Sequence, residues 1–291
     1  MSARLGFIGL GIMGAPMVRR LRGLGWPVTV WNLEPERFGA VAGSGAEWAD
    51  NPAAVRARSD ITVICVLDGK AVEACCFGPN GLARAEGGAG LLIDTSTINP
   101  DQTLSLAGRL RAEADMDWVD APMSGGPDAA ESGALTMMVG GDAASVARAD
   151  PVLRDLAANL TVAGPLGAGQ TAKILNQAIV GVGYVLMAEV LALAERTTLD
   201  VPALPRVLAG GMADSTALQR VFPQMQARAF DPPKGYARQL DKDLRNVAVF
   251  ARGLGLELPV LQAAIAQYAV YTEAGNGLQD SASVMRLYEA R

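Results

Sequence analysis

The chain has 291 residues, of which half are hydrophobic and 19% are charged, so it can bury a core and suits one large domain or two ordinary ones. Its formal net charge is −5 and no run of Lys or Arg stands out, which argues against a nucleic-acid partner, because such partners need a basic face. Histidine is absent, which excludes a Ser-His-Asp triad, a histidine metal site and a histidine acid or base. Any general acid or base must therefore be Lys, Asp, Glu, Tyr or Cys.

Cysteine usage and the apolar segments predict the cellular compartment of the protein. The chain has three cysteines, Cys65, Cys75 and Cys76, an odd number with no C-x-x-C pair, which indicates a reducing compartment, no disulfide framework and no zinc knuckle. The chain begins directly with a strand-like run, so we expect no signal peptide. The most apolar stretch, Ala178–Ala188, is shorter than the roughly 20 residues that span a bilayer. We therefore expect a cytoplasmic protein without membrane association.

Short apolar runs alternate with helix-like segments over the first half of the chain. Several of the runs are continuously apolar, which is typical of parallel strands covered on both faces. The strand candidates are Leu5–Ile8, Val28–Trp31, Ile61–Val66, Leu91–Asp94, Trp118–Val119 and Leu135–Val139, and the helices between them include Met13–Leu24 and Asp101–Ala114. This alternation predicts a doubly wound α/β domain.

The pattern changes near Gly164-Pro165, after which long helical patterns follow and no convincing strand appears. The predicted helices are Thr171–Thr197, Leu204–Leu208, Leu240–Leu254 and Val260–Glu273. We place a domain boundary near residue 164. Residues 1–164 would form a dinucleotide-binding domain, and residues 165–291 an all-helical domain for substrate binding and oligomerisation.

A glycine-rich turn follows the first predicted strand and begins a helix. It has the spacing G-x-G-x-x-G and consists of Gly9, Leu10, Gly11, Ile12, Met13 and Gly14. The first glycine would make a tight turn, the second would let the backbone approach a pyrophosphate, and the third would let helix and strand pack closely. An ordinary βα turn is the alternative. At the start of a βαβ unit, we favour a dinucleotide site.

The end of the second predicted strand should contact the ribose of such a dinucleotide. Asn32 stands at this position, about 20 residues past the turn, and Glu34 follows closely. Leu33 stands where an arginine would hold a 2′-phosphate, and Glu34 would repel that phosphate, whereas Arg37 could attract it. The sequence therefore slightly favours NAD over NADP.

The predicted long helix carries a lysine without a charged face around it. Between Thr171 and Ala188, Lys173 is the only charge, and Asn176 and Gln177 share its face at three and four residues' distance. The lysine could reach water from the helix start, which is the commoner fate of lysines. We favour a desolvated lysine, whose pKa moves readily and which suits proton transfer. With histidine absent, Lys173 is the leading acid or base.

Two loops that follow predicted strands are rich in small and hydroxylated residues. In the second, Ser124 offers a hydroxyl, and Gly125 and Gly126 offer backbone N–H groups that could bind an anion. In the first, Thr97 precedes Asn99-Pro100 and could alternatively cap a helix. Ligands of open α/β sheets lie at the carboxyl ends of strands, so both loops would face the cofactor. A structural turn before a helix is the alternative for the Ser124 loop.

Taken together, these segments resemble the β-hydroxyacid dehydrogenase family over essentially the whole chain. The resemblance rests on Gly6–Met17 (GFIGLGIMGAPM), Asp94–Pro100 (DTSTINP), Asp120–Gly126 (DAPMSGG), Leu135–Gly141 (LTMMVGG), Gly167–Gln177 (GAGQTAKILNQ) and Lys242–Leu244 (KDL). It implies a Rossmann-type domain followed by a helical domain, joined by a long helix. It also implies assembly as a homodimer or homotetramer through the helical domain.

The resemblance further implies roles for individual residues. Lys173 would be catalytic, and the substrate would contact Ser124, Gly125, Gly126, Asn176 and Gln177. Leu67, Asp68, Thr97 and Lys242 would line the cofactor together with the glycine turn. Asn176-Gln177 and the segment Gly210–Ser215 are similar to tartronate semialdehyde (2-hydroxy-3-oxopropionate) reductases.

The resemblance leaves the substrate open among small hydroxy acids and semialdehydes. We expect activity most like tartronate semialdehyde reduction, with 3-hydroxyisobutyrate, threonate and 4-hydroxybutyrate as alternatives. An imine reductase of related architecture is disfavoured, since those relatives usually lack a lysine here. A dinucleotide-binding protein without catalysis and a binding protein without cofactor are the remaining alternatives.

Overall fold

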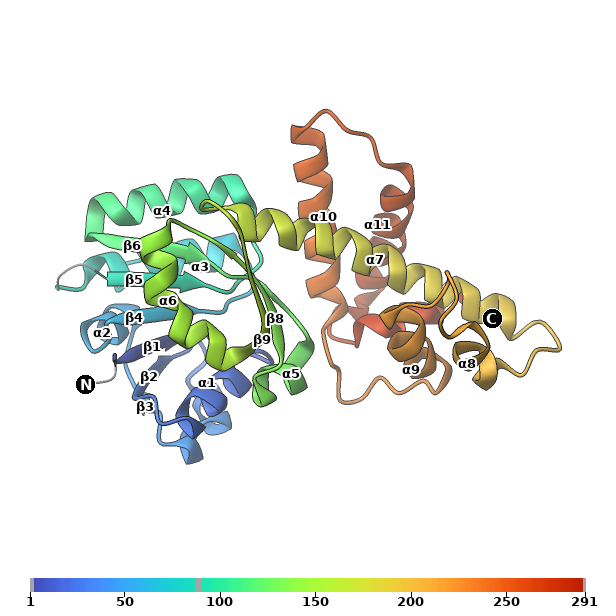
Figure 1. The fold of residues 1–291 in the computed structure, drawn as a ribbon, viewed down its shortest axis with the longest axis horizontal. Coiled ribbons are helices and arrows are strands. Elements are labelled where there is room, and N and C mark those ends of the chain that lie inside the picture. The colour runs from blue at the N-terminus through green and yellow to red at the C-terminus, as the bar shows by residue number, and fades with distance from the viewer. Residues whose placement is uncertain (1–2, 87–89, 290–291) are drawn as a thin grey trace. The chain divides into compact units, whose positions relative to one another are not determined.

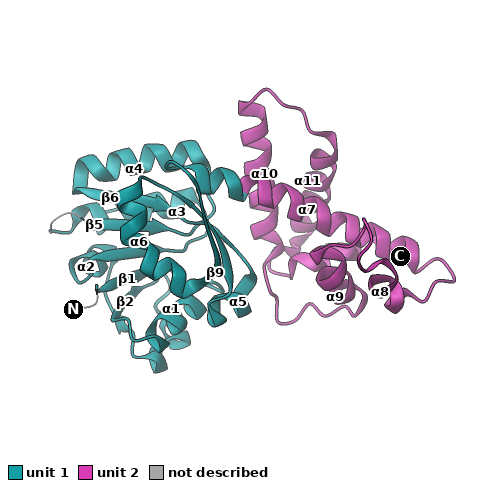
Figure 2. Ribbon diagram, viewed as in Figure 1, with its two compact units in different colours: residues 1–173 teal, residues 174–291 magenta. Residues whose placement is uncertain are grey.

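The computed structural model describes residues 3–86 and 90–289. The chain divides into two compact units, residues 1–173 (unit 1) and 174–291 (unit 2), shown in Figures 1 and 2. The division falls within a 27-residue helix, α7 (Ala168–Ala194), which begins in unit 1 and continues into unit 2. The domain boundary that the sequence predicts near residue 164 stays a prediction.

Unit 1 is built on one nine-stranded sheet with the strand order β3-β2-β1-β4-β5-β6-β8-β7, and β9 pairs with β8. The strands are β1 (Leu5–Ile8), β2 (Val28–Trp31), β3 (Glu47–Trp48), β4 (Ile61–Ile64), β5 (Gly90–Asp94), β6 (Met116–Asp120), β7 (Met123–Ser124), β8 (Leu135–Gly140) and β9 (Ala157–Gly164). The six strands from β3 to β6 are parallel neighbours in the order typical of dinucleotide-binding doubly wound sheets. The predicted Rossmann-type fold is confirmed.

Helices cover both faces of this sheet (Figure 1). Those on one face are α1 (Gly14–Gly23), α5 (Gly126–Ser132) and α6 (Ala143–Leu156). Those on the other are α2 (Pro52–Ala57), α3 (Gly69–Phe77) and α4 (Pro100–Ala114). In β5, Leu91 and Ile93 pack on the first face and Leu92 on the second. Because both faces are buried, the strands need apolar residues at successive positions. Each fully buried large apolar side chain stabilises the folded state by roughly 1.5–3 kcal/mol relative to an exposed one.

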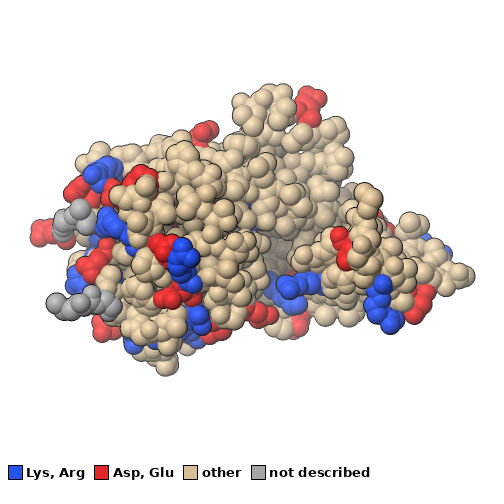
Figure 3. Space-filling model, in the orientation of Figure 1, with Lys and Arg blue, Asp and Glu red and all other residues tan. Residues whose placement is uncertain are grey.

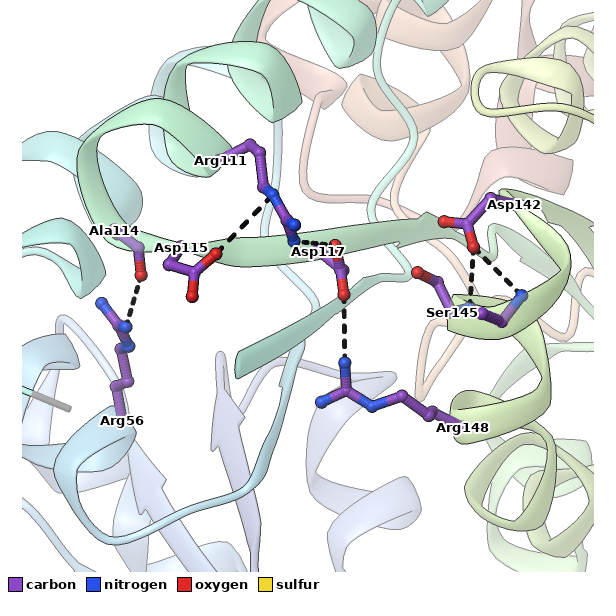
Figure 4. A network of polar contacts seen from close by, with 9 residues as sticks. Arg56, Arg111, Ala114, Asp115, Asp117, Asp142, Ser145 and Arg148 are labelled. Carbon is purple, nitrogen blue, oxygen red and sulfur yellow. Dashed lines mark hydrogen bonds and ion pairs between the residues drawn. The ribbon is translucent and has the colours of Figure 1, made fainter. Parts of the chain in front are cut away.

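Charged side chains join the amino end of β6 to two helices (Figure 4). Asp117 accepts hydrogen bonds from Arg111 of α4 and, at 3.0 Å, from Arg148 of α6. Nearby, the buried Arg56 donates to the Ala114 carbonyl at 2.6 Å. Asp117 is the second residue of β6, so this network lies at the amino end of the sheet, away from the carboxyl ends where ligands of this fold bind.

Unit 2 is helical, and no strand follows β9 in residues 165–289. Besides its part of α7, it contains α8 (Leu204–Leu208), α9 (Phe222–Gln226), α10 (Ala237–Gly253) and α11 (Pro259–Tyr271). Leu240, Leu244 and Val247 recur at helical spacing along α10 and enter the core of the unit. The Tyr268 hydroxyl, buried in this core, donates to the Ser281 carbonyl at 2.9 Å, which satisfies it. The predicted all-helical second part is confirmed.

Helix α7 begins and ends three residues earlier than its apolar pattern predicts. At its start, the carboxylate of Asp120 accepts hydrogen bonds from the backbone N–H groups of Gly167 and Gln170 at 2.8 and 2.7 Å. This cap comes from a strand 47 residues away in sequence, so local patterning cannot reveal it. Strand β4 likewise ends at Ile64 rather than Val66, because the Val66 N–H donates to the Ser96 hydroxyl and leaves the ladder.

Helix α7 is, among the described residues, long and apolar enough by length and composition to cross a membrane. The expectation from Ala178–Ala188 alone that no segment reaches this length is therefore wrong. Ile174, Ala188 and Leu191 of α7 are nonetheless buried in the core of unit 2. A central core helix needs the same apolar composition, because neighbouring helices surround it.

Candidate active site

The glycine-rich turn joins β1 to α1 and has the close contacts that the sequence predicts. Gly9 has φ +102°, and a Cβ there would lie 2.1 Å from the Cys65 carbonyl oxygen. A Cβ at Gly14 would lie 1.9 Å from the Gly9 carbonyl oxygen. A Cβ at Gly11 would meet no atom within 4 Å, so this glycine borders open space. Gly9 and Gly14 therefore serve the turn and the packing, and Gly11 leaves room for a ligand.

The first turn of α1 fits the pyrophosphate of a dinucleotide. Within the described residues, no side chain caps this turn and no acidic residue lies in it, so its N–H groups face no competing anion. Leu10, Ile12 and Met13 supply the backbone between the glycines. The residues present thus fit a dinucleotide at this turn.

Asn32 stands at the end of β2, and its contact with a ribose stays a prediction. The Asn32 side chain is buried, and its Oδ1 accepts a hydrogen bond from the Leu10 N–H at 2.7 Å. Its Nδ2 donates to the Glu34 carboxylate at 2.7 Å. Asn32 therefore fixes the glycine turn, and Glu34 presents a held carboxylate beside it. Leu33 is largely exposed.

The loops after β4 and β5 lie side by side at the carboxyl edge of the sheet. Leu67 is exposed, whereas Asp68 caps α3 by accepting from the Ala71 N–H at 2.9 Å. The helix after the second loop is capped by Asn99, which accepts from the Asp101 N–H, so capping is not the role of Thr97. The half-buried Thr97 belongs to the same edge as Leu67.

Lys173 lies at the loop that carries Ser124. The lysine is only 7% exposed, and its Nζ donates a hydrogen bond to the Met123 carbonyl oxygen at 2.7 Å. Ser124 pairs with Thr136 in the sheet, and Gly125 and Gly126 follow with φ +140° and +78°. The structure therefore brings the predicted proton-transfer residue to the predicted carboxylate loop, and the lysine does not extend into bulk water.

Two polar residues that the sequence interpretation did not select hold this arrangement in place. Asp120 and Gln170 are fully buried, at 0% exposure, where β6 meets the first turn of α7. Burial raises the pKa of Asp120, and the N–H groups of Gly167 and Gln170 oppose that rise. The sequence could have pointed to Asp120, because its carboxylate ends an apolar strand and directly precedes a loop of small residues. Gln170 gave no local signal.

The remaining predicted residues belong to unit 2 and form a chain of hydrogen bonds there. Asn176 lies three residues after Lys173 on the same helix and donates to Gln177 at 2.8 Å. Gln177 donates to the Asp243 carboxylate at 2.6 Å, and the Lys242 ammonium lies 2.9 Å from the other oxygen of that carboxylate. Asp243, buried and not selected from the sequence, thus joins the KDL segment to α7. The contact of these residues with substrate or cofactor stays a prediction.

The fold, the glycine turn and the lysine at the carboxyl edge together define an oxidoreductase that uses NAD or NADP. Residues 4–164 match the model of the NAD-binding domain of 6-phosphogluconate dehydrogenase. Residues 167–288 match the model described as the NAD-binding domain of NADP-dependent 3-hydroxyisobutyrate dehydrogenase. The chain belongs to the β-hydroxyacid dehydrogenase family.

Individual relatives extend over the whole chain. It is 36% identical to 2-hydroxy-3-oxopropionate reductase of Escherichia coli (strain K12) over 288 residues, which cover 98% of this chain and 97% of the relative. It is 32% identical to 3-hydroxyisobutyrate dehydrogenase of Pseudomonas aeruginosa, with 99% of both chains covered. A solved structure of Mycobacterium tuberculosis 3-hydroxyisobutyrate dehydrogenase with L-serine matches with TM-score 0.88, 28% identity and complete coverage of both chains.

Proposed function

We propose that this protein interconverts a small β-hydroxy acid and its semialdehyde, with Lys173 as the proton donor or acceptor. The observation that carries the proposal is the burial of Lys173 beside the Ser124 loop, with its Nζ 2.7 Å from the Met123 carbonyl. When bound, a nicotinamide would supply or accept the hydride. The chain's own residues would bind and orient the substrate and exclude water from it.

Each residue of unit 1 at this edge has a distinct proposed task. In the reductive direction, the Lys173 ammonium would donate a proton to the forming alkoxide and stabilise its negative charge. The Ser124 hydroxyl and the N–H groups of Gly125 and Gly126 would hold the substrate carboxylate. Because Lys173 is buried, little water would compete for the proton.

For the substrate, we favour tartronate semialdehyde (2-hydroxy-3-oxopropionate). The Escherichia coli relative is named for this compound, and it shares more than a third of its residues with this chain. The test is to assay NAD(H) and NADP(H) with tartronate semialdehyde and with the acids 3-hydroxyisobutyrate, threonate and 4-hydroxybutyrate. The highest kcat/KM should fall on tartronate semialdehyde. A higher kcat/KM with 3-hydroxyisobutyrate would instead assign the protein as a 3-hydroxyisobutyrate dehydrogenase.

Two other classes of function predict different results in the same assay. An imine reductase would reduce cyclic imines and not hydroxy-acid semialdehydes, and Lys173 argues against it. A dinucleotide-binding protein without catalysis would bind NADH, measured by fluorescence, and turn over none of these acids. A binding protein without cofactor would give no NADH signal at all.

Glu34 leads us to propose NAD rather than NADP. Its carboxylate is held by Asn32 and would repel a 2′-phosphate, whereas it could accept a hydrogen bond from a 2′-hydroxyl. In Glu34→Arg, we expect the ratio of kcat/KM for NADPH to that for NADH to rise about tenfold or more, which corresponds to about 1.4 kcal/mol. Glu36→Arg is the matched control, since it makes the same charge change at an exposed position two residues away. An equal shift in both variants would assign the effect to net charge and not to Glu34.

We further propose that the protein is a cytoplasmic homodimer or homotetramer that assembles through the helices of unit 2. In Figure 3, a broad surface over α7, α10 and α11 carries few charged side chains. Along α7, Leu175, Ile179, Leu186 and Leu193 are exposed, and their spacing places them on one helix face. We expect light scattering to give two or four chains for the wild type. Leu186→Glu with Leu193→Glu should yield monomers, and an unchanged mass would exclude this face.

A further inference from the structure

Gln170 joins the first turn of α7 to the loop after β5 through both ends of its side-chain amide. Its Oε1 accepts a hydrogen bond from the Ile98 N–H at 3.1 Å, and its Nε2 donates to the Ser96 carbonyl oxygen at 2.8 Å. We call these two bonds the Gln170 bridge. The side chain is 0% exposed, and all the groups involved lie in unit 1.

The loop on the far side of the bridge is itself held to the loop after β4. The Ser96 hydroxyl accepts from the Val66 N–H at 3.0 Å, and the Ser96 N–H donates to Asp94 at 2.9 Å. The Thr95 hydroxyl donates to the Ile64 carbonyl at 2.8 Å. The segment from Thr95 to Ile98, which includes Thr97, is therefore fixed to the sheet at several points. The bridge attaches α7 to a rigid partner.

The backbone of Gln170 is fixed as well. Its N–H donates to Asp120 at 2.7 Å, and a Cβ at the neighbouring Gly169 would lie 2.4 Å from the Met138 carbonyl oxygen. The first turn of α7 thus contacts β6, β8 and the loop after β5 with little space to move. Lys173 lies three residues later on the same face of the helix, so any shift of Gln170 moves the ammonium with it.

We propose that Gln170 is a positioning residue, which sets the place of the Lys173 ammonium relative to the Thr97 loop, which the resemblance places beside the cofactor. The inference rests on the proposed role of Lys173 in proton transfer. A planar amide that both donates and accepts allows one orientation, so it fixes the helix in translation and rotation. Proton transfer depends on such placement, and a misplacement of about 1 Å can lower turnover about 100-fold.

The test is Gln170→Met, which keeps the length of the side chain and removes both hydrogen bonds. We expect kcat to fall about 10- to 100-fold, while the Kd for NADH changes less than about threefold, because the glycine turn is untouched. The kinetic isotope effect on kcat with 4-deuterated NADH should change as well. Thr62→Val is the matched control, since it removes a buried hydroxyl that lies 3.2 Å from the Ser59 hydroxyl near the amino end of β4. It should lower Tm without changing kcat or the isotope effect.

A second measurement does not need turnover. Competitive acetylation with acetic anhydride, read by peptide mass at Lys173, should show a shifted pH midpoint in Gln170→Met and the wild-type midpoint in Thr62→Val. A wild-type kcat and an unshifted midpoint in folded Gln170→Met would overturn the positioning role, and so would equal losses in Thr62→Val. If the wild type turns over no hydroxy acid, the proposed function fails, and the acetylation midpoint alone decides the positioning role.

Discussion

Lys173→Met should lower kcat with the preferred semialdehyde by about 10²–10⁴-fold, the range typical of losing one general acid or base. Methionine has nearly the length of lysine and is apolar, so it suits a site where the lysine is 7% exposed. The variant keeps the fold but loses the proton and the positive charge beside the forming alkoxide. NADH binding should change less than about threefold, because the glycine turn and the end of β2 stay intact. Steady-state kinetics and fluorescence titration measure the two quantities separately.

Lys70→Met is the matched control for this variant. Lys70 is an exposed lysine on α3, so the same substitution removes one charge from the same unit without touching the Ser124 loop. Its kcat should equal that of the wild type. Undiminished turnover in Lys173→Met would refute Lys173 as the acid or base.

Asp120→Ala should destabilise the protein by about 3–5 kcal/mol, because it leaves two buried backbone N–H groups at the start of α7 without their carboxylate. Each hydrogen bond to a charged group typically contributes about 1.5–3 kcal/mol. Urea unfolding followed by circular dichroism measures the loss. Asp117→Ala is the control, since it removes an aspartate from the same strand whose partners are partly exposed arginines, and it should cost only about 1 kcal/mol.

The difference in the free energy of unfolding between the wild type and Asp120→Ala should also depend on pH. Burial raises the pKa of Asp120 above its ordinary value of 3.8, so the native state binds the proton more tightly than the unfolded state. The contribution of this group is therefore greatest below the unfolded pKa and declines as pH rises through the raised native value. The free-energy gap between wild type and Asp120→Ala should thus be larger near pH 4 than at pH 7. A gap that grows with pH would mean that the carboxylate bonds lower the native pKa instead.

Much of the site was predictable because its signals are local. The glycine spacing of Gly9–Gly14 expresses backbone geometry that only glycine satisfies, and it can be read without neighbours. Lys173 is conspicuous because it is the one charge on an apolar helical segment. The continuous apolar runs of β4 and β5 indicate burial on both faces, which restricts the fold to a covered parallel sheet. These features follow from residue type and short spacing alone.

The hydrogen-bond partners of these residues depend on segments far apart in sequence. The sequence does not reveal that the Asn32 side chain accepts a hydrogen bond from the Leu10 N–H, because the end of β2 lies against the glycine turn only in the folded sheet. Strand β9 (Ala157–Gly164) escaped prediction because most of its residues are exposed and it gains its order by pairing with β8.

The sequence by itself determined the class of fold, the dinucleotide turn and the lysine, since each depends on local geometry or periodicity. Only the tertiary structure decided where α7 begins and what holds Lys173 in place. Asp120 and Gln170 act through groups 47 to 74 residues away, and hydrogen bonds over such separations form only when the chain has packed.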